Sequence, residues 1–181
     1  MRFSTAPTPP MVCRLARNRS ASDMDARYIN PFLEAVRSVF STMVHLDVEL
    51  GRPQLAEALP RYDVSGIIGM SGDVVGSIVL SFPTPVAVQV IGRFASTELH
   101  PSSPDFADAL GELVNMISGA AKAKFEGKNV SISTPSVVIG AGHTVARPAR
   151  TACISLPCRV FCGDFSIDIA IREQPSSAVA A

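Results

Sequence analysis

The sequence predicts an α+β fold in which a largely antiparallel sheet of six strands carries two long helices packed on it. Three observations lead to this prediction. Apolar residues recur at helical spacing in two long segments, three short runs with strand character follow each segment, and the whole order repeats once. We interpret the chain as two copies of one α-β-β-β unit related by a pseudo-twofold axis, although the copies match only weakly in sequence.

Length and composition are those of a single domain. With 181 residues, 47% of them hydrophobic, the chain can form one core and bury roughly two thirds of the surface that its unfolded form exposes. We expect this domain to cover residues 24–173. Residues 1–23 are interpreted as a disordered arm, a weak targeting segment or a non-native extension ahead of a start at Met24, and residues 174–181 as a disordered tail.

The first half begins with a helix predicted over about residues 30–44. Asn30 and Pro31 suit its N-cap and first helical position, and apolar residues follow at helical spacing. Ser71 and Gly72 form a short link that suits a hairpin between the second and third of the strands that follow. Those strands are predicted at residues 47–55, 63–70 and 73–82, and a helix-compatible stretch follows at 85–94.

The second half begins with the longest predicted helix. Ser103 directly precedes Pro104 and makes a good N-cap, Asp105 complements the helix dipole, and the apolar spacing continues to about Phe125. Gly127 marks the end of this helix. Strands are then predicted at residues 129–140, 151–157 and 164–172, and the last of them shows the clearest alternation of apolar and polar residues.

Both copies of the repeat carry a proline in the first strand after the long helix. These residues are Pro53 and Pro135. Proline has no N–H to donate to a strand ladder, so this position is compatible with a sheet edge or a bulge.

Charge and hydropathy restrict the classes of partner. Lys and Arg together number 16, as do Asp and Glu, so there is no broad basic face for nucleic acid. Charged residues, Gly or Pro interrupt every apolar run before it reaches the roughly 20 residues that a membrane-spanning helix needs. We therefore expect a cytoplasmic protein that binds neither nucleic acid nor membrane and recognises its partner locally.

The cysteines and histidines do not form a recognisable metal or nucleophile site. Cys153, Cys158 and Cys162 have C-x4-C and C-x3-C spacings without a fourth ligand nearby, and the histidines are scattered. In a chain of this size the cysteines are best interpreted as reduced thiols. No metal site is predicted.

The outward face of the longest helix is unusual. A projection at about 100° per residue places an apolar stripe on one side and the following residues opposite it: Asp108, Gly111, Glu112, Asn115, Gly119 and Lys122. Each glycine costs the helix about 1 kcal/mol relative to alanine, but it gives clearance for another molecule beside the Asn115 amide. Taken alone, this pattern fits a docking surface or a solvated face whose glycines assist helix packing.

A resemblance to a known family distinguishes these two interpretations. The stretch at residues 110–122, LGELVNMISGAAK, resembles the E-x-x-N helix of the CheC, CheX and FliY family of response-regulator phosphatases. Glu112 and Asn115 stand at its two signature positions, and Ala120 departs from the polar residue, often Asn, expected there. The stretches at residues 29–40 and 132–140 resemble the opening helix of CheX proteins and the strand after their catalytic helix, so the similarity covers about residues 24–173.

The first helix is similar to the single-site members of that family. Glu34 and Arg37 form E-x-x-R where CheC-like members carry a second E-x-x-N, and an arginine lacks the carbonyl acceptor needed to position a water. The chain therefore resembles the CheX type.

The resemblance implies a phosphatase that hydrolyses the aspartyl phosphate of a CheY-like response regulator. Asn115 would orient the attacking water and Glu112 would pair with the regulator's lysine. The rest of the face is expected to contact the regulator: Asp108, Gly111, Gly119 and Lys122. The protein would need no cofactor of its own, because Mg²⁺ is held by the regulator, and it would form a homodimer through a sheet edge. The alternatives are a non-catalytic CheX-like module that docks on a regulator or motility component, and a structural assembly subunit.

Overall fold

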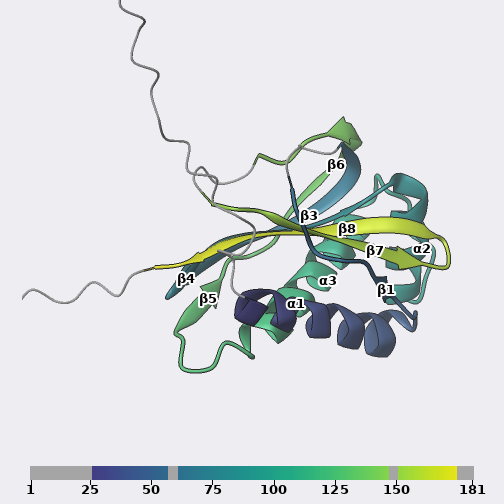
Figure 1. Ribbon diagram of the computed structural model, residues 1–181. Coiled ribbons are helices and arrows are strands. Elements are labelled where there is room, and N and C mark those ends of the chain that lie inside the picture. The colour runs from purple at the N-terminus through teal and green to yellow at the C-terminus, as the bar shows by residue number, and fades with distance from the viewer. Residues whose placement is uncertain (1–25, 57–60, 147–150, 175–181) are drawn as a thin grey trace, which may run out of the picture.

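The computed structural model describes residues 26–56, 61–146 and 151–174, and it confirms the α+β class. The helices lie against one face of a twisted sheet (Figure 1). They are α1 (Ala26–Val39), which continues as a π-helical turn (Phe40–Val44), α2 (Thr84–Phe94) and α3 (Pro104–Lys122). The strands are β1 (Glu49–Leu50), β2 (Gln54–Leu55), β3 (Tyr62–Gly72), β4 (Val74–Phe82), β5 (Val130–Ile132), β6 (Ser136–His143), β7 (Ile154–Val160) and β8 (Gly163–Glu173).

The predicted count of six strands is wrong for the described part of the chain, which has eight in one sheet. Two of the predicted runs each divide into two short strands. The first divides between β1 and β2 around Pro53, and the second between β5 and β6 at Pro135. A proline cannot donate to the ladder, so each run stops pairing at that point and resumes beyond it.

The strand order confirms the predicted repeat. All pairs are antiparallel, and the order is β1-β7-β8-β4-β3-β5, with β2 also on β7 and β6 also on β3. The divided strand of each half therefore pairs with the middle strand of the other half. Because β4 and β8 pair with each other at the centre, both divided strands lie at the edges of the sheet.

The first helix begins a turn earlier than the sequence predicts. Pro31 lies inside α1 rather than at its first position, so Asn30 is not the N-cap. The extra turn is held by apolar contacts, since Ile29 is buried and the Tyr28 ring packs on Phe125, with 5.8 Å between the ring centroids. The predicted segments at 1–23 and at most of 174–181 lie outside the described residues.

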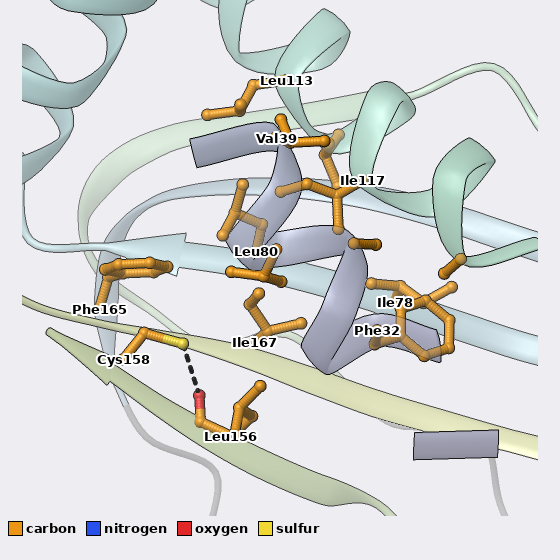
Figure 2. Close-up of a cluster of buried hydrophobic side chains, with 14 of the residues drawn as sticks. Phe32, Val39, Ile78, Leu80, Leu113, Ile117, Leu156, Cys158, Phe165 and Ile167 are labelled. Carbon is orange, nitrogen blue, oxygen red and sulfur yellow. Dashed lines mark hydrogen bonds between the residues drawn. The ribbon is translucent and has the colours of Figure 1, made fainter. Parts of the chain in front are cut away.

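The core lies between the helices and the inner face of the sheet (Figure 2). Phe165 of β8 stacks between Phe40 and Phe82, at centroid distances of 5.0 and 4.9 Å. Cys158 is buried nearby and its Sγ donates to the Leu156 carbonyl at 3.5 Å. Burial raises the pKa of this thiol to about 12, so Cys158 is a neutral core side chain.

Candidate functional site

Helix α3 begins where the sequence predicts, because its first residues satisfy the free backbone groups. The Ser103 Oγ accepts a hydrogen bond from the Phe106 N–H at 3.2 Å, Pro104 fills the first position, and Asp105 lies in the first turn. Lys122 ends the helix, a few residues before the predicted end near Phe125. Both ends are thus matched to the helix dipole.

The buried side of α3 is broad. It holds the apolar stripe that the sequence predicts, and also residues on the flank that faces the sheet: Phe106, Leu110, Gly111, Leu113, Val114, Ile117, Ser118 and Ala121. Val114 packs over β3, where a Cβ placed on Gly66 would lie 3.0 Å from its Cγ1. The buried residues therefore cover a little less than half of the circumference of the helix, and the outward side remains free of the core.

Glu112 and Asn115 lie on that outward side. Glu112 is exposed and Asn115 is partly exposed. Residues three apart on a helix have neighbouring side chains, so the carboxylate and the amide point outward together. Neither side chain hydrogen-bonds or ion-pairs with any other residue that the structure describes, and both are therefore available to a partner.

The remaining predicted residues divide into two groups. Asp108 is exposed, Lys122 is half-buried, and a Cβ on the half-buried Gly119 would meet no atom within 4 Å. These three lie where the sequence places them. Gly111 does not: it is buried, and its Cβ position is 3.2 Å from Cγ and 3.5 Å from Cβ of Pro135. The prediction that Gly111 gives clearance to a partner is wrong, because the protein's own chain occupies that space.

Helix α1 flanks α3 on one side and runs antiparallel to it. The Glu34 carboxylate accepts a hydrogen bond from the Lys124 ammonium at 2.5 Å, and Phe32 packs on Phe125. The glutamate of the E-x-x-R pattern is therefore paired within the protein, while Arg37 is exposed. Both partners of the ion pair are about half exposed, so the pair orients the helix ends more than it stabilises them.

The stretch between β5 and β6 flanks α3 on the other side. Its residues Ser133, Thr134, Pro135 and Ser136 are exposed, and they are named the 133–136 segment below. The sequence interpretation of Pro135 is limited to a sheet edge or a bulge and does not place it beside α3. The sequence signal for this contact is Gly111, because the Pro135 ring occupies the space that a side chain at position 111 would fill.

Three cavities lined by described residues lie elsewhere, and Glu112 and Asn115 are not among their lining residues. One of about 800 Å³ lies between α2 and the chain that leads to α3, and Arg93, Leu99 and His100 are among its lining residues. Glu112 and Asn115 instead lie on the open surface of a helix, an arrangement that suits contact with a macromolecule better than capture of a small ligand.

Three further observations concern the described residues. They contain no cluster of three or more His, Cys, Asp or Glu side chains placed to hold a metal ion. Within the same residues Cys153, Cys158 and Cys162 are free cysteines. No helix among them is long and apolar enough to cross a membrane.

Comparisons with known proteins identify the family of this chain. The family model described as "Chemotaxis phosphatase CheX" matches residues 64–159, more than half of the chain. The chain is 27% identical over 155 residues to the CheY-P phosphatase CheX of Thermotoga maritima, covering 83% of this chain and 99% of the relative.

Solved structures give the same result. A chemotaxis protein CheX from Desulfovibrio desulfuricans is 30% identical, with a TM-score of 0.75 over 81% of this chain and 99% of that one. CheX in a CheX–CheY–BeF3–Mg²⁺ complex from Borrelia burgdorferi is 26% identical, with a TM-score of 0.71 over 81% of this chain and 98% of that one. This chain therefore belongs to the CheX family of chemotaxis phosphatases.

Proposed function

We propose that this protein is a phosphatase that hydrolyses the aspartyl phosphate of a CheY-like response regulator. The observation that carries the proposal is the pair Glu112 and Asn115, which is exposed and without partners among the described residues. The pair stands at the E-x-x-N positions of a CheX-family chain. The Thermotoga maritima relative is a CheY-P phosphatase, and the Borrelia burgdorferi structure is a complex of CheX with CheY.

The chemistry required of the protein is small. An aspartyl phosphate is an activated acyl phosphate. Its hydrolysis mainly requires a water held in line with the phosphorus and neutralisation of the negative charge on the phosphoryl oxygens. A side-chain amide can accept a hydrogen bond from that water and donate one to a phosphoryl oxygen at the same time. Asn115 projects from a rigid helix and can enter the regulator's active centre in this role.

Mg²⁺ is expected on the regulator and not on this protein. The Borrelia burgdorferi complex contains Mg²⁺ and BeF3 together with CheX and CheY. In our proposal the regulator supplies the aspartate, the cation and a lysine, and this protein supplies the amide and the docking face, which includes Asp108, Gly119 and Lys122. We place the reaction in the cytoplasm, where response regulators are phosphorylated.

The direct test follows the decay of the regulator's aspartyl phosphate with and without catalytic amounts of the protein. Acceleration that grows with the protein concentration is expected. A lifetime that stays unchanged while the protein binds the BeF3-activated regulator would assign it to the non-catalytic docking class.

Replacing Glu112 by alanine is expected to raise KM for the phosphorylated regulator about tenfold and to change kcat little. The proposed ion pair with the regulator's lysine contributes to docking, and losing a charged partner at an interface commonly costs about that factor. Steady-state kinetics over a range of regulator concentrations measure both constants. Glu126→Ala is the control, because it removes an exposed carboxylate beyond the end of α3. Kinetics of Glu112→Ala equal to those of the wild type would remove this residue from the model.

We also propose that the protein forms a homodimer through the edge of the sheet at β6. This strand pairs with β3 along one side, and no described strand pairs with its other side. Its Val138 and Ile139 are large apolar residues with 37% and 41% exposure. A long apolar edge strand of this kind favours pairing with a second copy.

Ile139→Lys is expected to convert this dimer to a monomer, because a lysine on an edge strand opposes strand-to-strand association. Sedimentation velocity distinguishes a species of 19.1 kDa from one of twice that mass. Leu55→Lys is the matched control, since Leu55 is 38% exposed on β2 at the opposite edge. If Leu55→Lys dissociates the dimer and Ile139→Lys does not, the interface lies at the β2 edge and the proposal for β6 is wrong. A monomeric wild type would exclude the dimer.

A further inference from the structure

The 133–136 segment is fixed to the sheet at its first residue. The Ser133 N–H donates to the Gly69 carbonyl at 2.9 Å, and the Ser133 Oγ accepts from the Gly69 N–H at 3.0 Å. The same hydroxyl donates to the Thr134 carbonyl at 2.7 Å. Both polar groups of Ser133 are thus used to hold the segment on β3, and its path is set by the fold rather than by a partner.

The segment is fixed to α3 at its third residue. The Pro135 ring lies over Gly111, at 3.2 Å from the point where a Cβ would be. Contacts this close are rare for real side chains, so the approach depends on a glycine at position 111. Val137 lies 3.8 Å from the same point and continues the contact into β6.

The strand beyond the segment is also anchored. The Asp63 carboxylate accepts hydrogen bonds from the Gly142 N–H at 3.2 Å and from the Thr84 N–H at 3.1 Å. These bonds hold the pKa of Asp63 below its ordinary value. The His143 Nε2 lies 2.8 Å from the Ser65 Oγ. Because β6 is held at its far end as well, the 133–136 segment is suspended between fixed points.

The segment forms a ridge along the side of α3 that carries Asn115. Gly111 and Asn115 are four residues apart, so they lie on one face of the helix and about one turn from each other. The segment contacts α3 at Gly111, and all of its residues are exposed. A molecule that covers the Asn115 amide and extends one helical turn toward the start of α3 would therefore meet this ridge.

A contact on the ridge would fix the orientation of a bound partner, which contact with α3 alone does not. A partner that rests on one helix can rock about the helix axis, and such rocking moves the amide relative to the phosphorus. Displacements of about 1 Å in an active site can cost a hundredfold in rate. A second point of contact, away from the axis and on the side of Asn115, removes that freedom.

We propose that the 133–136 segment is a specificity-determining contact for the regulator. Gly111 and Pro135 are positioning residues, because their contact sets how far the segment stands out from α3 beside Asn115. This inference rests on the proposed function. The ridge carries hydroxyl groups and no charge, with Thr134 at its centre. It therefore recognises neutral hydrogen-bonding groups of the receiver domain next to the phosphorylated aspartate, whereas Glu112 recognises a cation.

The test measures KM and kcat for decay of the regulator's phosphate with four variants. Gly111→Ala pushes Pro135 outward and is expected to raise KM about fivefold with kcat within about twofold of the wild type. Pro135→Ala removes the ring and is expected to have a smaller effect of the same kind. The double variant Gly111→Ala/Pro135→Ala makes room for the methyl group and is expected to restore part of the KM lost in Gly111→Ala. Thr134→Ala is expected to raise KM about threefold without any change in packing.

Matched measurements separate docking from folding. Alanine is a better helix former than glycine, so thermal unfolding of Gly111→Ala is expected at or near the wild-type temperature. Ser131→Ala removes an exposed hydroxyl from β5, outside the ridge, and is expected to keep the wild-type KM. A merely structural role would lower the unfolding temperature without this split between KM and kcat.

The outcomes distinguish this inference from the function on which it rests. If the wild-type protein accelerates decay and Thr134→Ala and Gly111→Ala both keep its KM, the ridge has no role in docking and the inference is overturned. If these variants lower kcat at unchanged KM, it is overturned too. If the wild-type protein has no effect on the regulator's phosphate, the proposed function fails and the inference fails with it.

Discussion

Asn115→Ala is expected to reduce stimulated dephosphorylation of the regulator at least about 100-fold while the fold stays intact. The amide is the one group that our mechanism places beside the attacking water, and removing a positioned hydrogen-bonding group from an active centre commonly costs that much. The side chain is partly exposed and has no hydrogen-bond partner among the described residues. Its truncation therefore leaves no buried polar group unsatisfied, and stability is expected to change little.

The measurement is single-turnover decay of the phosphorylated regulator at saturating protein, which isolates the chemical step from docking. Asn30→Ala is the matched control, because it removes an exposed amide from the neighbouring helix α1. Binding of Asn115→Ala to the BeF3-activated regulator should persist, since the proposed docking contacts remain. Normal turnover by Asn115→Ala would rule out the mechanism, whatever the docking geometry.

The outward orientation of Glu112 and Asn115 could be predicted from local sequence alone, whereas their role as a site is inferred from the family resemblance. Ser103 and Pro104 fix where α3 begins, and the apolar spacing then fixes which residues of the helix face inward. Glu112 lies near the middle of the opposite side and is exposed, whereas Asn115 lies closer to the buried Gly111 and is partly exposed. This orientation is predictable because the cap and the apolar spacing that determine it both belong to a single helix.

Gly111 shows why the edge of the same face could not be predicted. A helical projection assumes one buried side, but α3 packs on β3 beneath it, on α1 at one flank and on the 133–136 segment at the other. The contact with Pro135 joins residues 24 positions apart in the sequence. Local periodicity does not report a contact of this kind, and glycine is compatible with an exposed or a closely packed position.

Local patterns also do not predict that strands of one half pair with strands of the other half. β1 and β2 pair with β7 of the second half, and β5 and β6 pair with β3 of the first half. Sequence periodicity identifies strands but not their partners. The prolines correctly indicated edge positions, although they divide the strands that contain them.

The repeat gives two similar helices, and only one of them presents the E-x-x-N pair. At the corresponding place in α1, Glu34 pairs with Lys124 just beyond the end of α3. The pair contributes little energy because both groups are exposed, but it joins the middle of α1 to the residues just beyond the helix that carries Asn115. The first copy of the unit thus supports α3 in place of forming a second site.

Phe165→Ala is expected to lower the free energy of unfolding by about 3–5 kcal/mol, the usual cost of removing a buried phenylalanine. The ring is 4% exposed and stacks on Phe40, the first residue of the π-helical turn after α1, and on Phe82 at the end of β4. Its loss leaves a cavity where β8, β4 and the first helix meet. This is a large part of the roughly 5–15 kcal/mol that stabilises a typical domain.

Urea unfolding followed by circular dichroism measures the change, and Phe161→Ala in the same β7–β8 hairpin is the matched control. Phe161 is 67% exposed, and its ring lies beneath the Arg93 guanidinium at 4.9 Å, a contact worth about 0.5–1 kcal/mol at an exposed site. A difference of about 3 kcal/mol between two identical substitutions then reports mainly the burial and packing of the Phe165 ring. Equal effects of the two would contradict the packing of the three rings. The folded fraction of Phe165→Ala should keep the wild-type KM for the regulator, because Phe165 lies in the core and its described ring contacts do not involve α3.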